Sequence, residues 1–529
     1  MDSQISRAIE RADLHALERL GDGLWFEVPR DYGARLLSLL RRLPPETLNG
    51  HPQILMAGYL AHQLGSRRSP WSRYQNFYTT WGRRYAATFS SFRHPADVLT
   101  AGMIALIGAR LRGDFTEAEK IARRVEEHVT HRRGHGAVPW HSDPATHRPG
   151  WIAAQRSLTT LLMGRFDDAM THARMGYEQS TSAAMRSARG NAAAYAALLS
   201  ALSGSRRHAV EWLRKAEDLS EPSRGIAPFL TAPARIARVV LAIDELDEHR
   251  AEAMLIELGD AAAGYEIWPF VAAAWARFDL LFRNPAFGLI RLDETLIAQG
   301  ATESADRIAG GILLSARADL LLAAGEAQSA LALSTAYPAN ARLRAVAGRA
   351  HLRAGQAARA IRASSMPLRR AGSSRDKLDH LLVLATAQLR RGSTADAVAL
   401  FDTASTYVES SGILSALLEI PQGDLEELCR RTGRMKLYEQ VVARAGHHES
   451  RPVELVELTP REQIILHALA GDDTLQAIAQ SLSVSINTVR SQVRSVYRKL
   501  QVSTRDDAIA VATRSGLLGL PPARPAERS

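Results

Sequence analysis

Apolar residues along most of this chain recur every three or four positions, which is the period of an amphipathic helix. From the start to about residue 445, one such helix follows another, rich in Ala, Leu and Arg. Runs of alternating β-branched residues, which indicate strands, hardly occur in this region. The pattern predicts an all-α fold.

A recurring unit divides this helical region: an apolar helix, a Gly turn, and a second helix with Ala on its inner face. It occurs in six segments, "ARLRGDFTEAEKIARRV", "LLMGRFDDAMTHAR", "ALSGSRRHAVEWL", "LLLAAGEAQSALAL", "HLRAGQAARAIRAS" and "QLRRGSTADAVALF". Glycines in neighbouring units lie roughly 30 to 40 residues apart, which is typical of helical hairpins. A hairpin cannot bury its apolar face alone, so we expect stacked hairpins, an α-solenoid, over residues 1–445. The Gly-turn-Ala core resembles that of tetratricopeptide repeats, although the period varies and the aromatic positions of that family are often absent.

The composition changes after the repeats. The stretch "AGHHESRPVELVE" combines His, Gly, Ser and Pro with charge and predicts a linker at residues 446–454. A separate domain is expected over residues 455–520, followed by a Pro-rich polar tail, 521–529, to which no function is assigned.

Four short helices are predicted in this C-terminal domain. Thr459 and Glu462 are three residues apart, which is the spacing of a capping box at the start of a helix. Pro460, between them, is favoured in the first turn of a helix. Thr474 and Ser485 are placed to cap the second and third helices. Apolar residues predict the buried stripes of the three helices: Ile465, Leu466 and Leu469; Leu475, Ile478, Ala479 and Leu482; Val489, Val493, Val496 and Leu500.

The third helix, residues 486–500, has a cationic face opposite its valines. That face carries Asn487, Arg490, Ser491, Arg494 and Arg498, with Lys499 beside them. No acidic residue lies between Ile486 and Gln501. A short helix, a tight turn and a basic helix are the parts that set a recognition helix into the major groove of DNA.

These residues also resemble a known family, the LuxR-type helix-turn-helix proteins. The resemblance is carried by "LTPRE", Ala470-Gly471, "IAQSLSVSINTVRSQVRSVYRKL" and "VSTRDDAIAVA". It implies that Arg490, Ser491 and Arg494 contact base edges, and that phosphates are held by Asn487, Thr488, Gln492, Arg498 and Lys499. Two positions depart from the family pattern: Gln492, where many members carry His, and Gln501, where Gly commonly follows the third helix.

The resemblance has further implications. The fourth helix, "TRDDAIAVATRSGL", is similar to the helix through which the family dimerises, so a homodimer on double-stranded DNA is expected. The stretch "LLSLLRRLPPETLNGHPQILMAGYLAHQ" resembles the start of the repeat region in large MalT-like, ATP-dependent LuxR regulators. Those proteins carry an NTPase domain, but this chain has no GK[ST] phosphate-binding loop and does not open like a receiver domain.

Eight aromatic residues crowd positions 71–92, and helical spacing makes core packing their default interpretation. The alternative is a ligand pocket lined by Trp71, Tyr74, Tyr78, Trp81 and Arg84. A second unusual stretch holds His128, His131, His135, His141 and His147. It lacks the Cys or carboxylate spacing of a zinc site, so we interpret it as a polar loop and expect no metal.

Composition narrows the function further. Lys and Arg number 66 against 56 Asp and Glu, which favours polyanionic partners, and one cysteine, Cys429, excludes an intrachain disulfide framework. No signal peptide, membrane span or catalytic motif is found, so a non-enzymatic cytoplasmic, nucleoid-associated protein without a cofactor is expected. Two hypotheses stay open: a transcription regulator controlled by a ligand or protein bound to the repeats, with RNA polymerase a candidate partner, or a scaffold whose repeats recruit a partner to DNA.

Overall fold

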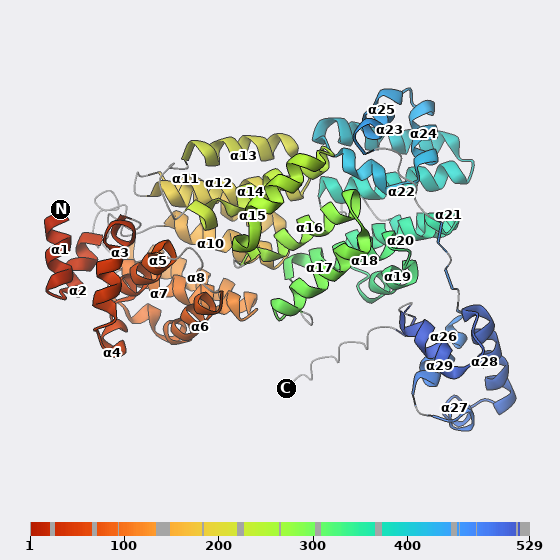
Figure 1. Cartoon of the computed structure of the whole chain (residues 1–529), viewed down its shortest axis with the longest axis horizontal. Coiled ribbons are helices and arrows are strands. Elements are labelled where there is room, and N and C mark those ends of the chain that lie inside the picture. Colours follow the sequence, from red (N-terminus) through yellow and green to blue (C-terminus); the bar gives the residue numbers. More distant parts are fainter. Residues whose placement is uncertain are drawn as a thin grey trace. The chain divides into compact units, whose positions relative to one another are not determined.

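The structure of the protein is a computed structural model, and within the residues that it describes the chain is helical, with no strand (Figure 1). This confirms the predicted all-α fold. None of the described helices is long and apolar enough to cross a membrane. The structure describes residues 2–21, 27–65, 71–93, 95–133, 149–181, 185–219, 227–263, 266–301, 308–365, 373–445, 452–453, 455–456, 458–471, 473–514 and 517–518.

The helices group into two compact units. The first comprises Met1–Leu241, His249–Ala274 and Arg307–Gly310. The second comprises Ala242–Glu248, Trp275–Asp306 and Gly311–Ser529, so the C-terminal helices are grouped with the later hairpins. The predicted division of the chain at residues 446–454 stays a prediction.

The first unit holds the N-terminal helices. They are α1 (Asp2–Glu10), α2 (Leu14–Gly21), α3 (Glu27–Leu40), α4 (Pro45–Leu48), α5 (Pro52–Gly65), α6 (Trp71–Thr88), η1 (Phe89–Ser91), α7 (Pro95–Leu111), α8 (Phe115–Arg133), α10 (Pro149–Leu162), α11 (Phe166–Gln179), α12 (Arg186–Leu202), α13 (Arg206–Leu219), most of α14 (Ala227–Asp244) and α15 (Glu248–Ala263). Helix α16 (Trp268–Phe282) contributes residues to both units.

The second unit continues from α16. Its repeat helices are α17 (Pro285–Ala298), η3 (Ile308–Gly311), which is shared with the first unit, α18 (Ile312–Ala323), α19 (Ala327–Ala336), α20 (Ala341–Arg353), α21 (Ala357–Ser364), α22 (Ser374–Arg390), α23 (Thr394–Ser411), η5 (Leu414–Glu419), α24 (Gln422–Arg431) and α25 (Met435–Ala445). The last four helices are α26 (Pro460–Ala470), α27 (Leu475–Ser481), α28 (Ile486–Leu500) and α29 (Arg505–Arg514).

Each of the six predicted Gly turns joins two helices that pack against each other. The turn glycines all have positive φ: Gly113, Gly164, Gly204, Gly325, Gly355 and Gly392. After each glycine, the next amide donates to a carbonyl five residues back, as from Arg165 N to Thr160 O at 2.8 Å. This is the Schellman ending, in which a left-handed residue satisfies the last carbonyls of a helix.

Within the second unit, successive hairpins also pack on one another. Helix α20 contacts both α18 and α22, while α19 contacts α20 and α21 contacts α22. A buried arginine joins three elements of this stack: Arg349 of α20 forms ion pairs with Asp319 of α18 and with Glu419 of η5, the latter at 2.5 Å. Apolar packing and paired buried charge therefore both link the hairpins.

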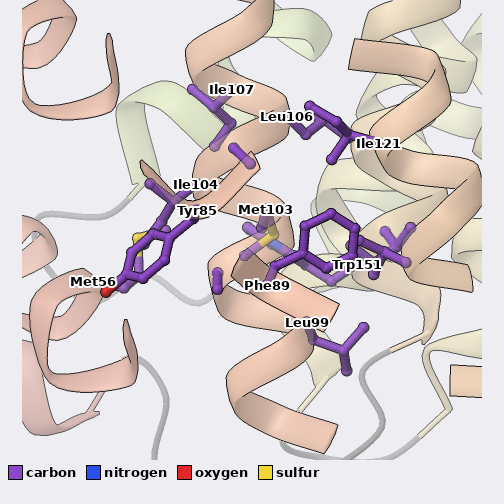
Figure 2. Packing of buried hydrophobic residues seen from close by; sticks show 14 of the residues in the cluster. Met56, Tyr85, Phe89, Leu99, Met103, Ile104, Leu106, Ile107, Ile121 and Trp151 are labelled. Atoms are coloured by element: carbon purple, nitrogen blue, oxygen red, sulfur yellow. The ribbon is translucent and has the colours of Figure 1, made fainter. Parts of the chain in front are cut away.

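Aromatic residues of α6 and η1 fill the core of the first unit. Figure 2 shows Tyr85 and Phe89 among apolar side chains of α5, α7, α8 and α10, and both are fully buried. The Tyr85 hydroxyl lies 3.4 Å from the carbonyl oxygens of Leu48 and Asn49 at the end of α4. For these residues the structure confirms core packing.

Two turn glycines offer a matched test of this geometry. A Cβ on Gly164 would lie 2.4 Å from the Cα of Gly310, whereas a Cβ on Gly113 would meet no atom within 4 Å. Gly113→Ala should cost only the left-handed strain, about 1 to 2 kcal/mol, and Gly164→Ala should cost more because backbone must also move. Calorimetric melting of both variants checks this, and equal decreases in Tm would contradict it.

Candidate nucleic-acid interface

The four C-terminal helices α26–α29 build two small cores around α28. One contains Ile465, Leu469, Ile478, Ala479, Val489 and Val493, and the other contains Leu466, Val496, Leu500, Ala508, Ala512 and Leu517. Helix α28 contributes to both and contacts α26, α27 and α29 (Figure 1). Its predicted stripe is buried, and that burial fixes which side of the helix faces outward.

Side-chain caps begin these helices where the sequence predicts them. The Glu462 amide donates to Thr459 Oγ1 at 3.3 Å, and the Thr459 amide donates to Glu462 Oε2 at 2.7 Å, which completes the capping box. Thr474 Oγ1 accepts from the Ala477 amide at 3.2 Å. Ser485 Oγ accepts from the Thr488 amide at 3.1 Å and starts α28.

Two non-glycine residues adopt left-handed conformations at helix ends. Ser483, with φ 53°, makes the turn between α27 and α28, and the Val484 amide donates to the Ala479 carbonyl at 3.0 Å. Gln501 ends α28 with φ 56°, and the Val502 amide donates to the Tyr497 carbonyl at 3.0 Å. Gln501 therefore takes the backbone conformation that Gly favours at this position of the family.

A buried carboxylate holds α26 to α28. Glu462 accepts hydrogen bonds from Ser495 Oγ at 2.7 Å and from Lys499 Nζ at 2.6 Å, besides that from the Thr459 amide. Burial raises the pKa of Glu462, but the hydrogen bonds from Lys499, Thr459 and Ser495 outweigh burial and hold its pKa at about 2. The sequence predicted the role of Glu462 in the capping box. Its hydrogen bonds to Ser495 and Lys499 of α28 join residues far apart in the sequence, and no local pattern indicates them.

The role of Arg505, the first residue of α29, was not predicted from the sequence. Its guanidinium donates to the backbone carbonyl of Leu469, in the last turn of α26, at 2.9 Å. It also donates to the carbonyls of Gly471 and, at 3.0 Å, Asp473, which follow that helix. Carbonyls at the end of a helix have no partner within the helix, so this cation satisfies them and complements the helix dipole.

The three residues expected to contact bases lie together on the outward face of α28. Arg490, Ser491 and Arg494 are all exposed. Within the described part of the chain, no hydrogen bond or ion pair engages either arginine. The guanidinium groups of Arg490 and Arg494 are therefore available to a bound anion, unlike that of Arg349, which is paired internally.

The five residues expected to contact phosphates differ in their exposure and in their contacts within the domain. Asn487, Thr488 and Arg498 are exposed, and Gln492 is half-buried. Thr488 Oγ1 lies 2.9 Å from the capping Ser485 Oγ. The Lys499 ammonium is directed at Glu462, so a phosphate contact by Lys499 would share a group already held within the domain.

Of the predicted ligand pocket, the structure describes three side chains. Tyr78 is buried against Tyr59, with ring centroids 4.8 Å apart. Trp81 is half-buried, and the Arg84 guanidinium lies 5.7 Å from its ring centroid. The side chains of Trp71 and Tyr74 lie outside the described residues, and the pocket stays a prediction.

The His-rich stretch is described only in part. His128 is half-buried in α8, and His131 lies in the same helix. The remaining three residues, His135, His141 and His147, lie outside the described residues.

A capped short helix, a tight turn, and a longer helix with a buried stripe and an exposed cationic face define a helix-turn-helix domain. Comparison with known proteins specifies the family. Residues 456–512 match the family model described as bacterial regulatory proteins, luxR family. The C-terminal domain is therefore a LuxR-family helix-turn-helix domain.

Two curated relatives each match part of the chain. The transcriptional regulatory protein YdfI of Bacillus subtilis is 40% identical over 62 residues, which is 12% of this chain and 29% of the relative. The CsgBAC operon transcriptional regulatory protein of Escherichia coli is 31% identical over 91 residues, 17% of this chain and 41% of the relative. The chain thus spans less than half the length of each relative.

The low pKa of Glu462 predicts how the stability of the domain depends on pH. An ionised, hydrogen-bonded Glu462 stabilises the fold above its unfolded pKa of about 4.3. That contribution is lost as pH falls toward the folded value of about 2. Glu462→Gln should destabilise the domain by roughly 1 to 3 kcal/mol at pH 7, because charged hydrogen bonds are lost.

Hydrogen exchange of the α26 and α28 amides in the full-length protein, followed across a urea series, measures this difference. Wild type and Glu462→Gln should have clearly different midpoints at pH 7, and the midpoints should converge as the pH approaches 2. A difference that is independent of pH would show that the ionised carboxylate is not responsible.

Proposed function

We propose that this protein is a sequence-specific transcription regulator that inserts α28 into the major groove of double-stranded DNA. The observation that carries the proposal is the exposed Arg490, Ser491 and Arg494 surface on a helix whose opposite face is buried. The LuxR-family assignment of the domain supports it, as do the names of both relatives, which describe transcriptional regulatory proteins.

The charge of α28 suits a polyanion. The helix carries Arg490, Arg494, Arg498 and Lys499 and no acidic residue. Cationic groups that replace condensed counterions supply most of the affinity of DNA-binding proteins. With Glu462 neutralising Lys499, the three arginines form the cationic surface that faces solvent.

Within this surface we assign two roles. Arg490, Ser491 and Arg494 contact base edges, because a guanidinium donates two parallel hydrogen bonds to guanine O6 and N7. Asn487, Thr488, Gln492, Arg498 and Lys499 contact phosphates and fix the register of the helix on the duplex. Thr488 and Asn487 lie in the first turn of α28, where amides and the helix dipole also favour a phosphate.

We further propose that residues 455–520 form an independent domain, joined by residues 446–454 to a solenoid sensor formed by residues 1–445. A homodimer formed through α29 would present two copies of α28 to paired half-sites. Control of DNA binding by a ligand or protein bound to the repeats, contact with RNA polymerase, and a cytoplasmic, nucleoid-associated location belong to the same proposal. The role is regulatory rather than enzymatic.

A second candidate function is a scaffold whose repeats recruit a partner protein to DNA. One observation favours it: Phe287, Ile290 and Ile297 lie on one face of α17 and are 65%, 55% and 70% exposed. Exposed apolar side chains at helical spacing are typical of protein-binding surfaces.

A matched pair of variants tests the roles on α28. Arg494→Ala should weaken binding to the specific site by about 1 to 3 kcal/mol, or roughly 5- to 150-fold, and leave non-specific binding little changed. Arg498→Ala should weaken binding to every duplex and reduce the slope of log affinity against log salt by about 0.9. Arg207→Ala, an exposed arginine of α13, makes the same charge change outside the domain.

Binding is measured by fluorescence anisotropy on a duplex selected by genome-wide capture and on a scrambled duplex, across a salt series. Equal losses on both duplexes for Arg494→Ala would contradict its role in base contact. Losses in Arg207→Ala as large as those in Arg498→Ala would show that net charge alone is responsible.

The two functions make different predictions for the repeats. A small-molecule effector should raise the Tm of the purified full chain in a metabolite screen, because it binds only the folded state. A scaffold should instead capture a stoichiometric partner whose recovery is lost in Ile290→Glu. A metabolite that stabilises wild type and changes DNA affinity would exclude the scaffold as the main function.

A further inference from the structure

Three potential metal ligands from distant parts of the first unit meet beside α2. His15 and Glu18 lie one turn apart on α2, and His51 immediately precedes α5. The Glu18 carboxylate is 10% exposed and the His51 side chain is 12% exposed, while His15 is 78% exposed. The three donors thus form a site that is buried on one side and open to solvent on the side of His15.

The distances among the donor atoms suit one small cation. His51 Nδ1 lies 3.0 Å and His15 Nδ1 lies 3.7 Å from Glu18 Oε2, and ligand atoms of all three residues lie within 4.8 Å of one another. Tetrahedral zinc with bonds of about 2.0 to 2.1 Å separates its ligand atoms by roughly 3.3 Å.

One oxygen of the buried Glu18 carboxylate has no hydrogen-bond donor among the described residues. Glu18 Oε1 is fully buried and accepts no hydrogen bond from any described residue. An unpaired buried carboxylate oxygen is costly, and a cation at the site would remove that cost. Asp97, which accepts a hydrogen bond from Gln53 at 3.0 Å, adds negative potential near His51.

We propose that His15, Glu18 and His51 bind a zinc ion, with water completing a four-coordinate site. Two imidazoles and one carboxylate are a ligand set that zinc uses in proteins. The ion would join α2 to the start of α5, two helices that also share an apolar core including Leu14, Leu17 and Ile54. Metal occupancy would thereby set the stability of the N-terminal end of the repeats.

The competing arrangement is an ion pair between protonated His51 and Glu18. The 3.0 Å separation between His51 Nδ1 and Glu18 Oε2 suits that pair in mildly acidic solution. Zinc needs the neutral imidazole and displaces the proton. Binding should therefore be strong at pH 7.5 and should weaken as pH falls, which gives the test a second measurement.

The probe is zinc alone, added to the metal-free full-length protein and followed by equilibrium dialysis with elemental analysis. Exposed imidazoles in general bind zinc weakly, so the informative quantity is the difference between variants. Wild type should hold one more zinc per chain than His15→Ala or His51→Gln. His208→Ala, an exposed histidine of α13, should match wild type.

His15→Ala is the decisive variant, because its side chain is 78% exposed and its removal leaves the core intact. Circular dichroism without metal should be the same for wild type and His15→Ala, and zinc should raise the Tm of wild type only. Equal zinc content and equal Tm shifts in the two proteins would overturn the proposal and leave the ion pair. These outcomes do not depend on DNA binding.

Discussion

The burial of one apolar stripe on α28 is the constraint on which the proposed DNA surface depends. Val489, Val493, Val496 and Leu500 can enter the two small cores only if the opposite side of the helix faces outward. The cationic surface is therefore positioned by hydrophobic packing rather than by contacts of its own. Glu462 also fixes the rotation of α28 about its own axis, because its hydrogen bonds to Ser495 and Lys499 hold that helix against the beginning of α26.

The helical hairpins use one backbone device repeatedly. A left-handed residue ends the first helix, and the following amide satisfies a carbonyl five residues back. Glycine fills this position in most hairpins, whereas Ser483 and Gln501 fill it in the helix-turn-helix domain. The left-handed conformation is strained for any residue with a Cβ atom. The domain therefore tolerates backbone strain at Ser483 and Gln501, on either side of α28. The same termination thus shapes both the repeats and the domain.

Local signals allowed much of this structure to be predicted. Hydrophobic periodicity located the helices, recurring glycines marked the turns, and Thr459, Thr474 and Ser485 marked the helix starts. Contacts between distant residues gave no such signal. The carbonyl cap by Arg505, the ion pairs of Arg349, and the meeting of His15 with His51 each depend on how helices pack in three dimensions. The DNA contacts of α28 were predicted from a family pattern and remain predictions.

The most direct test of the central claim is site-directed cleavage of DNA from α28. The native thiol, Cys429, is fully buried and its burial raises its pKa to about 11, so a cysteine introduced at the exposed Ser491 can be labelled selectively with an iron chelate. Bound to a captured specific duplex, labelled Ser491→Cys should cut the DNA backbone at nucleotides inside the protected site. Full binding without cleavage inside the site would contradict the account, because another surface would then hold the DNA.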